Sequence, residues 1–253
     1  MRQLRKAHFD LFRLLNEHFL FLTRKQVALI LTLSANPTIK WLLWLVSEHY
    51  LERRYRASSF SDFQTPLYYL GPKAWRMLGN PPESYKPYRA GIEQWSGVQL
   101  EHQLAVYDVI LKFLLEAGVR RIVQSQDRFW HESLSFEVIP DAWIEYAGGQ
   151  AFLEIDRATE SRQVVMQKLE KYIRFNESGL HKILLPGTTF RVLFITTSEE
   201  WIEALEQLTR SDDVWFATME EFLKEPLDHQ HWFALKGFYA LQIAPKEEVQ
   251  ELR

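Results

Sequence analysis

Apolar residues near the start of the chain recur at the spacing of amphipathic helices. Residues 3–18 place their apolar side chains on one helical face. The stretch Thr23–Gln26 has the pattern of a capping box, which predicts a second helix over residues 24–33. Asn36-Pro37 combines an N-cap residue with a proline for the first helical position, and it predicts a third helix that ends near His49.

Short strand-like runs replace this helical spacing after the third helix. Two strands, Leu51–Ser58 and Thr65–Leu70, are predicted around the polar tip Ser59–Gln64. Pro72 then opens a short helix that Gly79 ends. Three helices followed by a β-hairpin is the order of a winged helix-turn-helix, whose third helix enters the major groove of DNA.

The second half of the chain alternates between strands and helices after a long helix over about residues 94–117. Several strands followed by alternating helices and strands favour an α/β domain with a mixed sheet. The predicted strands cover residues 119–124, 134–139, 141–146, 151–156, 189–196 and 214–217, and the predicted helices cover 160–176, 199–208 and 218–224.

A proline-rich stretch separates the two halves. Residues 79–92 contain three prolines and the pair Gly79-Asn80, which predicts a linker. The expected domains are therefore residues 1–78 and 93–253, and the expected fold class is α+β.

Charge differs between the two halves. Residues 1–90 carry a net charge of +8, whereas residues 91–253 carry −11, within a total of −3. A basic module favours a polyanion such as nucleic acid, and arginines on a hairpin suit phosphate. Protein contact or dimerisation is the alternative use of such a module. The predicted contacts with double-stranded DNA are Arg24, Lys40, Arg53, Arg54 and Arg56.

Composition excludes several classes of protein. The chain has no cysteine, which excludes disulfide frameworks and thiolate metal sites. No apolar run approaches 18 residues, and the N-terminus lacks the apolar core of a secretory signal. We therefore expect a cytoplasmic protein with no membrane partner.

Three carboxylates lie where the predicted strands begin or end. Asp141 follows Pro140 at the start of one strand, while Glu154 and Asp156 end another and share a face because side chains alternate along a strand. If the two strands pair, the carboxylates repel one another unless a cation lies among them. Oxygen ligands of this kind select Mg²⁺ or Mn²⁺, which activates water and stabilises charge on a phosphate. A strand-end turn or a solvated sheet edge is the alternative interpretation.

The chain resembles the plasmid replication-relaxation family over roughly residues 8–225. The segments that carry the resemblance are Leu22–Val27, Glu101–Asp108, Pro140–Ala142, Phe152–Ser161, Lys168–Tyr172 and Phe194–Ser198. Within them, Glu-x-Asp-Arg-x-Thr-Glu-Ser is the most specific. The order of elements around Pro140-Asp141 and Glu154 also resembles the restriction-endonuclease-like fold. The resemblance implies a winged helix joined to a nuclease-like α/β domain that processes plasmid or mobile-element DNA, and some relatives look like relaxases that nick at a transfer origin.

The nuclease motif, Pro-Asp followed later by Asp or Glu, one residue and Lys, is altered here. Asp156 stands in the position of the lysine, which normally stabilises or activates the nucleophile. Lys168 is a candidate substitute, because Val165, Lys168 and Tyr172 form one inward stripe of a helix. The alternative interpretation is that the Lys168 side chain passes beside the carboxylates and places its ammonium at the surface.

A helix-borne acid often completes the metal site in the nuclease-like fold. Glu101 and Asp108 share one helical face, and His102 is a candidate base or ligand, with a purely structural histidine as the alternative. Core packing is favoured for the hydroxyl-bearing Tyr107 and Tyr172. The predicted catalytic residues are Asp141, Glu154, Asp156, Lys168, Glu101 and His102, and the predicted metal ligands are Asp141, Glu154, Asp156 and Asp108.

Two functions remain open on these grounds. The first is a metal-dependent DNA endonuclease or nickase that its winged helix delivers to DNA. The second is a non-catalytic DNA-binding regulator or accessory factor. Its acid-rich domain would contact protein partners of plasmid replication or transfer, or a second copy of the chain.

Overall fold

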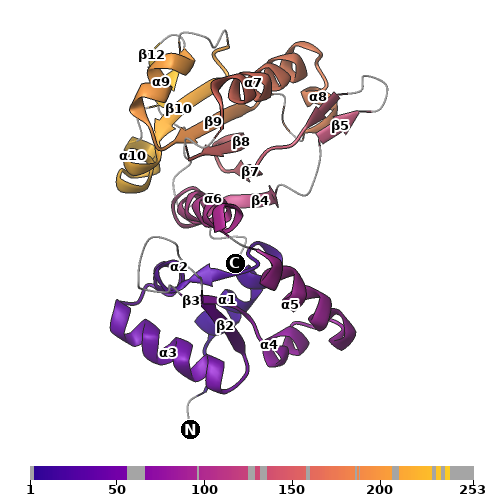
Figure 1. Cartoon of the computed structure of the whole chain (residues 1–253), viewed down its shortest axis with the longest axis vertical. Helices are drawn as coiled ribbons and strands as arrows, with labels where there is room; N and C mark the ends of the chain where they lie inside the picture. The colour runs from indigo at the N-terminus through magenta and orange to yellow at the C-terminus, as the bar shows by residue number, and fades with distance from the viewer. Residues whose placement is uncertain are drawn as a thin grey trace. The chain divides into compact units, whose positions relative to one another are not determined.

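The protein is a mixed α+β chain, as expected (Figure 1). Contacts within the computed structural model divide it into two units, Met1–Tyr107 and Asp108–Arg253. The structure describes residues 3–55, 66–95, 97–124, 129–131, 136–157, 160–185, 187, 189–206, 211–229, 232–234 and 237–239.

Three helices open the first unit: α1 (Lys6–Glu17), α2 (Arg24–Ile30) and α3 (Ala35–Ser47). The capping box of α2 is confirmed, because the Gln26 amide donates to Thr23 Oγ1 and the Thr23 amide donates to Gln26 Oε1. Asn36, the predicted N-cap of α3, instead lies inside the helix. Ser34 takes the N-cap position, and the amide and hydroxyl of Thr38 both donate to its carbonyl.

The predicted hairpin is present as β2 (Leu51–Tyr55) and β3 (Pro66–Leu70), paired antiparallel with Leu51 opposite Leu70. A two-residue strand, β1 (Leu22–Thr23), adds to β3, so the sheet order is β1-β3-β2. The predicted tip Ser59–Gln64 and Arg56 lie outside the described residues.

The predicted linker is wrong, because most of it is helical and packed. After α4 (Pro72–Met77), which ends before Gly79 at a φ of +81°, come η1 (Pro82–Ser84) and α5 (Tyr85–Gln94). The Tyr88 hydroxyl accepts from the Leu70 amide and donates to the Leu20 carbonyl. Prolines fit here because the first turn of a helix needs no amide donor. The boundary between the units instead falls inside α6 (Gly97–Glu116).

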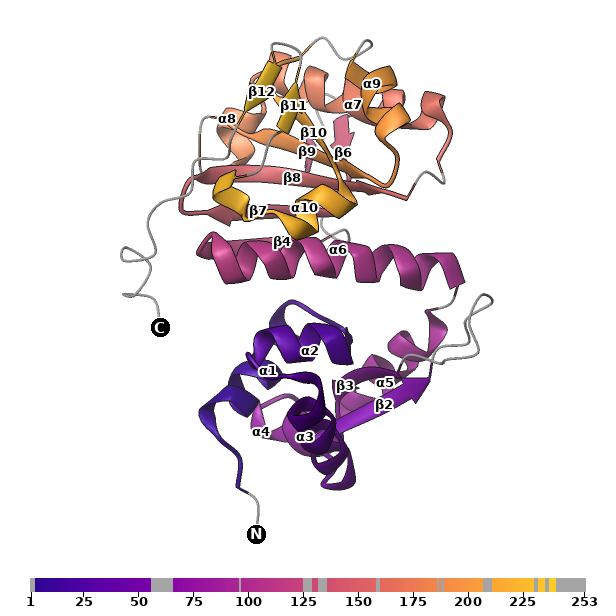
Figure 2. The ribbon, with the colours of Figure 1, turned by 90° about the vertical axis from the view of Figure 1, so that its left-hand side faces the viewer.

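The second unit is built on a seven-stranded sheet in the order β12-β11-β10-β9-β8-β7-β4. Strands β8, β9 and β10 are parallel, and the flanking pairs are antiparallel (Figure 2). The sheet strands are β4 (Val119–Gln124), β7 (Ala142–Tyr146), β8 (Gly149–Asp156), β9 (Arg191–Thr196), β10 (Val214–Thr218), β11 (Trp232–Ala234) and β12 (Gly237–Tyr239). The predictions missed β11 and β12.

Helices connect the parallel strands. The remaining elements are β5 (Phe129–His131), β6 (Phe136–Val138), α7 (Arg162–Glu177), α8 (His181–Leu184), α9 (Glu199–Glu206), α10 (Met219–Lys224) and η3 (Leu227–His229). Of these, β5, α8 and η3 were not predicted. Within the described residues no single helix has the length and apolar content of a membrane span; only α2 and α3, bent by 104° at their junction, reach that content together.

The two faces of this sheet bury different helices. Phe152 lies in a core cluster with Tyr172 and Phe175 of α7, on the same face as Trp143. The side chains of alternate residues point to the other face, where Tyr146 meets Phe113 at the C-terminal end of α6. Figure 1 shows α7 and α6 on opposite sides of the sheet.

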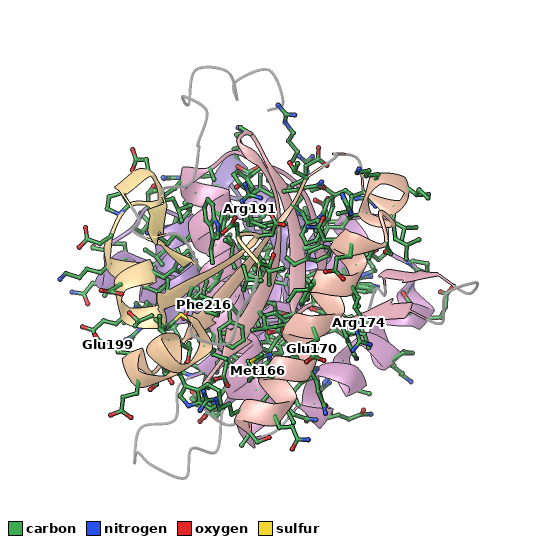
Figure 3. All side chains as sticks on the ribbon, turned by 90° about the horizontal axis from the view of Figure 1, so that it is seen from above. Met166, Glu170, Arg174, Arg191, Glu199 and Phe216 are labelled. Atoms are coloured by element: carbon green, nitrogen blue, oxygen red, sulfur yellow. The ribbon has the colours of Figure 1, made fainter. Side chains whose placement is uncertain are left out.

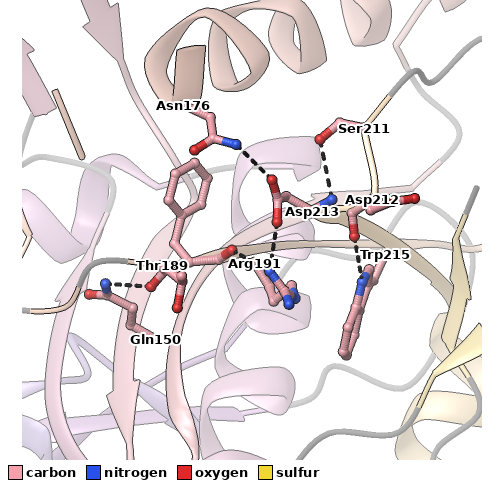
Figure 4. A network of polar contacts seen from close by, with 9 residues as sticks. Gln150, Asn176, Thr189, Arg191, Ser211, Asp212, Asp213 and Trp215 are labelled. Carbon is pink, nitrogen blue, oxygen red and sulfur yellow. Dashed lines mark hydrogen bonds and ion pairs between the residues drawn. The ribbon is translucent and has the colours of Figure 1, made fainter. Parts of the chain in front are cut away.

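A polar network fixes the starts of the parallel strands (Figure 4). The Asp213 carboxylate accepts from Arg191 at 2.6 Å and from the side chain of Asn176, at the end of α7, at 2.7 Å. The Arg191 guanidinium also lies 5.1 Å from the ring centre of Trp215. These contacts anchor β9, β10 and α7 at the end of the sheet away from the carboxyl end of β8.

Candidate functional site

The strands that carry the predicted carboxylates do pair. Strand β7 runs antiparallel to β8 with Ala142 opposite Leu153, and the Asp141 amide donates to the Leu153 carbonyl at 3.1 Å. The Ile155 amide in turn donates to Asp141 Oδ2 at 2.7 Å. Two backbone contacts therefore hold Asp141 beside the carboxyl end of β8.

Glu154 is buried on the face that α7 covers, with 2% of its surface exposed. The Tyr172 hydroxyl donates to Glu154 Oε1, and Lys168 Nζ lies 3.6 Å from Oε2. Burial raises the pKa of Glu154 to about 8; the charge of Asp141 acts in the same direction, whereas Lys168 and Tyr172 oppose it. The carboxyl group therefore holds a proton near neutral pH unless a further cation approaches.

Lys168 combines its two predicted alternatives, because its ammonium lies near the carboxylates while its side chain extends to the surface. Its Nζ lies 2.9 Å from Glu160 Oε1 as well as 3.6 Å from Glu154. Burial lowers the pKa of Lys168, but Glu154, Glu160 and Asp141 together outweigh burial and raise it. The side chain is one third exposed, so a charged ammonium lies at the mouth of the site.

We call Asp141, Glu154, Glu160, Lys168 and Tyr172 the Glu154 cluster. Tyr172 packs in the core, as predicted, and its hydroxyl also donates to Glu154, a contact that sequence reasoning missed. Sequence reasoning gave Glu160 no role, yet Glu160 accepts from the Lys168 ammonium. A signal for Tyr172 was available, since it follows Lys168 by four residues on the same helical face.

Asp156 ends β8 opposite Thr196 of β9 and is buried. By strand alternation it shares the face of Glu154, one step farther along β8. Among the described residues, no group of three or more His, Asp or Glu side chains is arranged to hold a metal ion. A pair of carboxylates still fits Mg²⁺, which keeps several waters and is commonly held by one or two carboxylates together with substrate phosphates.

The other predicted catalytic and metal-binding residues lie on α6. Asp108 belongs to the second unit, and the end of α6 beyond it packs on the sheet face opposite Glu154. Glu101 and His102 belong to the first unit, so their convergence with the carboxylates stays a prediction. Tyr107 is a core residue whose hydroxyl accepts from the Leu20 amide, as predicted.

Two of the predicted DNA contacts come together in the first unit. Arg53 lies opposite Tyr68 in the sheet. Burial raises the pKa of Tyr68, while the positive charges of Arg53 and Arg24 act to lower it, so both arginines lie near this tyrosine. Arg53 and Arg24 are exposed, as is Lys40 on α3. Lys40 borders a shallow hollow together with Asn36, Pro37 and Trp41.

Arg54 is separated from these cations. Adjacent strand residues point to opposite faces, and Arg54 donates to the Ile92 carbonyl of α5 at 2.7 Å. On that face α5 also contacts the strands through Arg89 and Glu52. Arg54 therefore has a structural partner that the arginine-rich sequence did not reveal.

The comparisons with known proteins give one match. The family model described as replication-relaxation matches residues 12–184, a stretch that includes α3, Asp141, Glu154 and Lys168. None of the curated proteins and none of the solved structures matches the chain significantly. The match covers well over half of the 253 residues. The chain therefore belongs to the replication-relaxation family.

Proposed function

We propose that the protein binds double-stranded DNA through its first unit and nicks or cleaves DNA with a divalent cation held by its second unit. Family membership relates the chain to the replication of plasmids or other mobile elements. The proposal adds a DNA-binding surface and a reaction to that broad assignment.

One observation carries the nuclease proposal: a lysine ammonium lies 3.6 Å from buried Glu154, next to a fixed Asp141. The nuclease motif places its lysine two residues after the acidic residue, where this chain has Asp156. Here the lysine comes from α7 instead. The same three chemical groups are thus brought together in space although the motif is incomplete along the chain.

The place of the Glu154 cluster in the sheet also supports a ligand site. Glu154 lies near the carboxyl end of β8, where parallel pairing with β9 changes to antiparallel pairing with β7. In open α/β sheets, ligands bind outside the carboxyl ends of the parallel strands, which is the end of β8 where Glu154 lies.

Each residue of the cluster has a role in this proposal. Asp141 and Glu154 hold Mg²⁺ or Mn²⁺, which when bound supplies an activated water and stabilises charge on the phosphate. The Ile155 amide fixes the orientation of Asp141, and Tyr172 fixes that of Glu154. Glu154 releases its proton before it can act as a ligand, and Lys168 offers its ammonium to the phosphate at the mouth of the site.

The first unit supports a winged-helix proposal. Its order of elements is helix, short strand, two helices and a hairpin, and the short strand pairs with the hairpin. Strand β2 of the hairpin contacts α3, the helix that would enter the major groove. Lys40 lies on α3 itself, and Arg53 lies on β2. Arg24 at the start of α2 adds a third cation, and phosphate contacts are the role that suits all three.

Removing Arg24 and Arg53 together is expected to weaken duplex binding by ten- to one-hundred-fold at low salt. Each lost phosphate contact lowers the slope of log K against log salt concentration by about 0.9, so the slope should fall by about 2 units. Fluorescence anisotropy over a salt series measures both quantities. Lys86→Ala is the matched control, because Lys86 is an exposed cation on α5, which packs on the opposite face of the sheet. An unchanged slope in the double variant would remove this surface from the proposal.

Nicking is tested with supercoiled and single-stranded DNA, each with and without Mn²⁺. Lys168→Met is expected to slow nicking by roughly one-hundred-fold while duplex affinity stays unchanged, since positioned charge at a phosphate commonly contributes this much to the rate. Lys171→Met, an exposed neighbour on α7, is the control. Duplex binding with no cleavage of either DNA under any condition would favour the non-catalytic DNA-binding factor instead.

A further inference from the structure

We propose that Glu160 is a positioning residue that holds the Lys168 ammonium at the mouth of the Glu154 cluster and prevents it from closing on Glu154. The inference rests on the proposed cation site and assigns a residue that the nuclease motif does not contain.

The distances show which carboxylate dominates the position of Lys168. Its Nζ lies 2.9 Å from Glu160 Oε1, within hydrogen-bond range, but 3.6 Å from Glu154 Oε2. Glu160 and Lys168 are each about one third exposed, whereas Glu154 is buried. The ammonium is therefore held toward solvent rather than drawn fully into the interior.

The local structure explains how a residue outside the helix reaches Lys168. Ser161 is the N-cap of α7, and its hydroxyl accepts from the Val164 amide, so Glu160 directly precedes the helix. Side chains on a helix lean toward its N-terminus, and Lys168 extends in that direction toward Glu160. The N-cap at Ser161 fixes the position of Glu160, and the helix fixes the position of Lys168.

Removing the Glu160 charge changes the balance between the two carboxylates. An ammonium has three donors, and here one contacts Glu160 while another faces Glu154. Without Glu160, Lys168 keeps Glu154 at 3.6 Å, and the ionised form of Glu154, which is the form that binds a cation, attracts the ammonium more strongly in buried surroundings than in water. Lys168 then closes on Glu154 Oε2 and competes with a divalent cation for that oxygen.

The test is Mn²⁺ titration of the full chain by calorimetry, with no DNA present. Glu160→Gln is expected to raise the Mn²⁺ dissociation constant about tenfold, because a nearby opposite charge commonly changes the proton affinity of a carboxylate by this much or more, and its effect on a cation at the same oxygen should be comparable. Glu160→Asp, which keeps the carboxylate, should recover most of the loss. Glu170→Gln is the matched control, because Glu170 pairs with Arg174 at 3.4 Å on the exposed side of the same helix (Figure 3).

A double variant, Lys168→Met with Glu160→Gln, tests whether Glu160 affects Mn²⁺ binding through Lys168. Lys168→Met should bind Mn²⁺ at least as tightly as the wild type, and adding Glu160→Gln to it should not weaken binding, because the positioning effect of Glu160 acts through Lys168. Equal Mn²⁺ affinity of wild type and Glu160→Gln would overturn the inference while leaving the cation site intact. A tenfold loss that persists without Lys168 would also overturn it. A wild type that binds no Mn²⁺ would refute the proposed site itself, and the inference with it.

Discussion

Replacing Glu154 with glutamine is expected to stabilise the metal-free protein at neutral and higher pH. Burial raises the pKa of Glu154 from an ordinary value of 4.5 to about 8, so the folded state binds a proton that the unfolded state has already released. The stability contributed by the neutral group is complete below about pH 4.5 and is lost as the pH rises to about 8. Since one pKa unit corresponds to about 1.4 kcal/mol, this loss is on the order of 3 kcal/mol at pH 7.

Glutamine removes this loss because it is neutral at every pH. Its carbonyl oxygen still accepts from Tyr172, whereas Lys168 loses its interaction with Glu154 and keeps those with Glu160 and the charge of Asp141. The net gain at pH 7 is therefore expected to be smaller, about 2 kcal/mol. Urea unfolding from pH 5 to 8.5, in the presence of a chelator, measures the difference between variant and wild type. A difference that does not grow with pH, or one that Glu170→Gln reproduces, would contradict the raised pKa.

Local signals in the sequence predicted several elements of the fold correctly. The Thr23 capping box is made by residues three apart, so the structure that it specifies needs no distant partner. The pairing of the strands that carry Asp141 and Glu154 follows from apolar runs and a short turn. Such features are predictable because their energetic causes lie within one or two elements.

Features that depend on tertiary contacts were not predictable in the same way. Prolines at 82 and 87 suggested a linker, but both lie in first turns, and Tyr88 then packs the segment against Leu20 and Leu70. Strand β1 has only two residues, too few for any periodic pattern. Its pairing with β3 comes from the hairpin rather than from its own sequence.

Candidate site residues were predicted best where a helix or strand fixes the side-chain direction. Helical spacing with Val165 and Tyr172 placed Lys168 on the inward stripe, and the structure brings its ammonium to Glu154. Glu160 precedes the N-cap of α7 in the structure, whereas the predicted helix began at residue 160 and gave it no contact with Lys168. Arg54 shows the opposite failure: composition grouped it with Arg53, but strand alternation turns it toward α5.

Asp141→Asn is expected to abolish two effects of Mn²⁺: stabilisation of the fold and DNA nicking. A cation that binds only the folded state raises the unfolding free energy by mass action, by about 2.7 kcal/mol at one hundred times its dissociation constant. Loss of one of two carboxylate ligands should remove most of this gain. Nicking should fall at least one-hundred-fold, since the same ion supplies the activated water.

The metal-free fold should tolerate this change, which separates loss of a ligand from loss of structure. The side-chain carbonyl of asparagine accepts from the Ile155 amide as Asp141 Oδ2 does, and the substitution removes a negative charge that raises the pKa of Glu154. Thermal unfolding with a chelator measures the metal-free stability, and thermal unfolding over a Mn²⁺ series measures the stabilisation by the cation. A plasmid nicking assay measures the reaction. Glu145→Gln, on the adjoining strand β7, is the matched control and should retain the Mn²⁺ effects. If Asp141→Asn keeps the full Mn²⁺-dependent stabilisation, then Asp141 does not hold the cation and the carboxylate pair has another role.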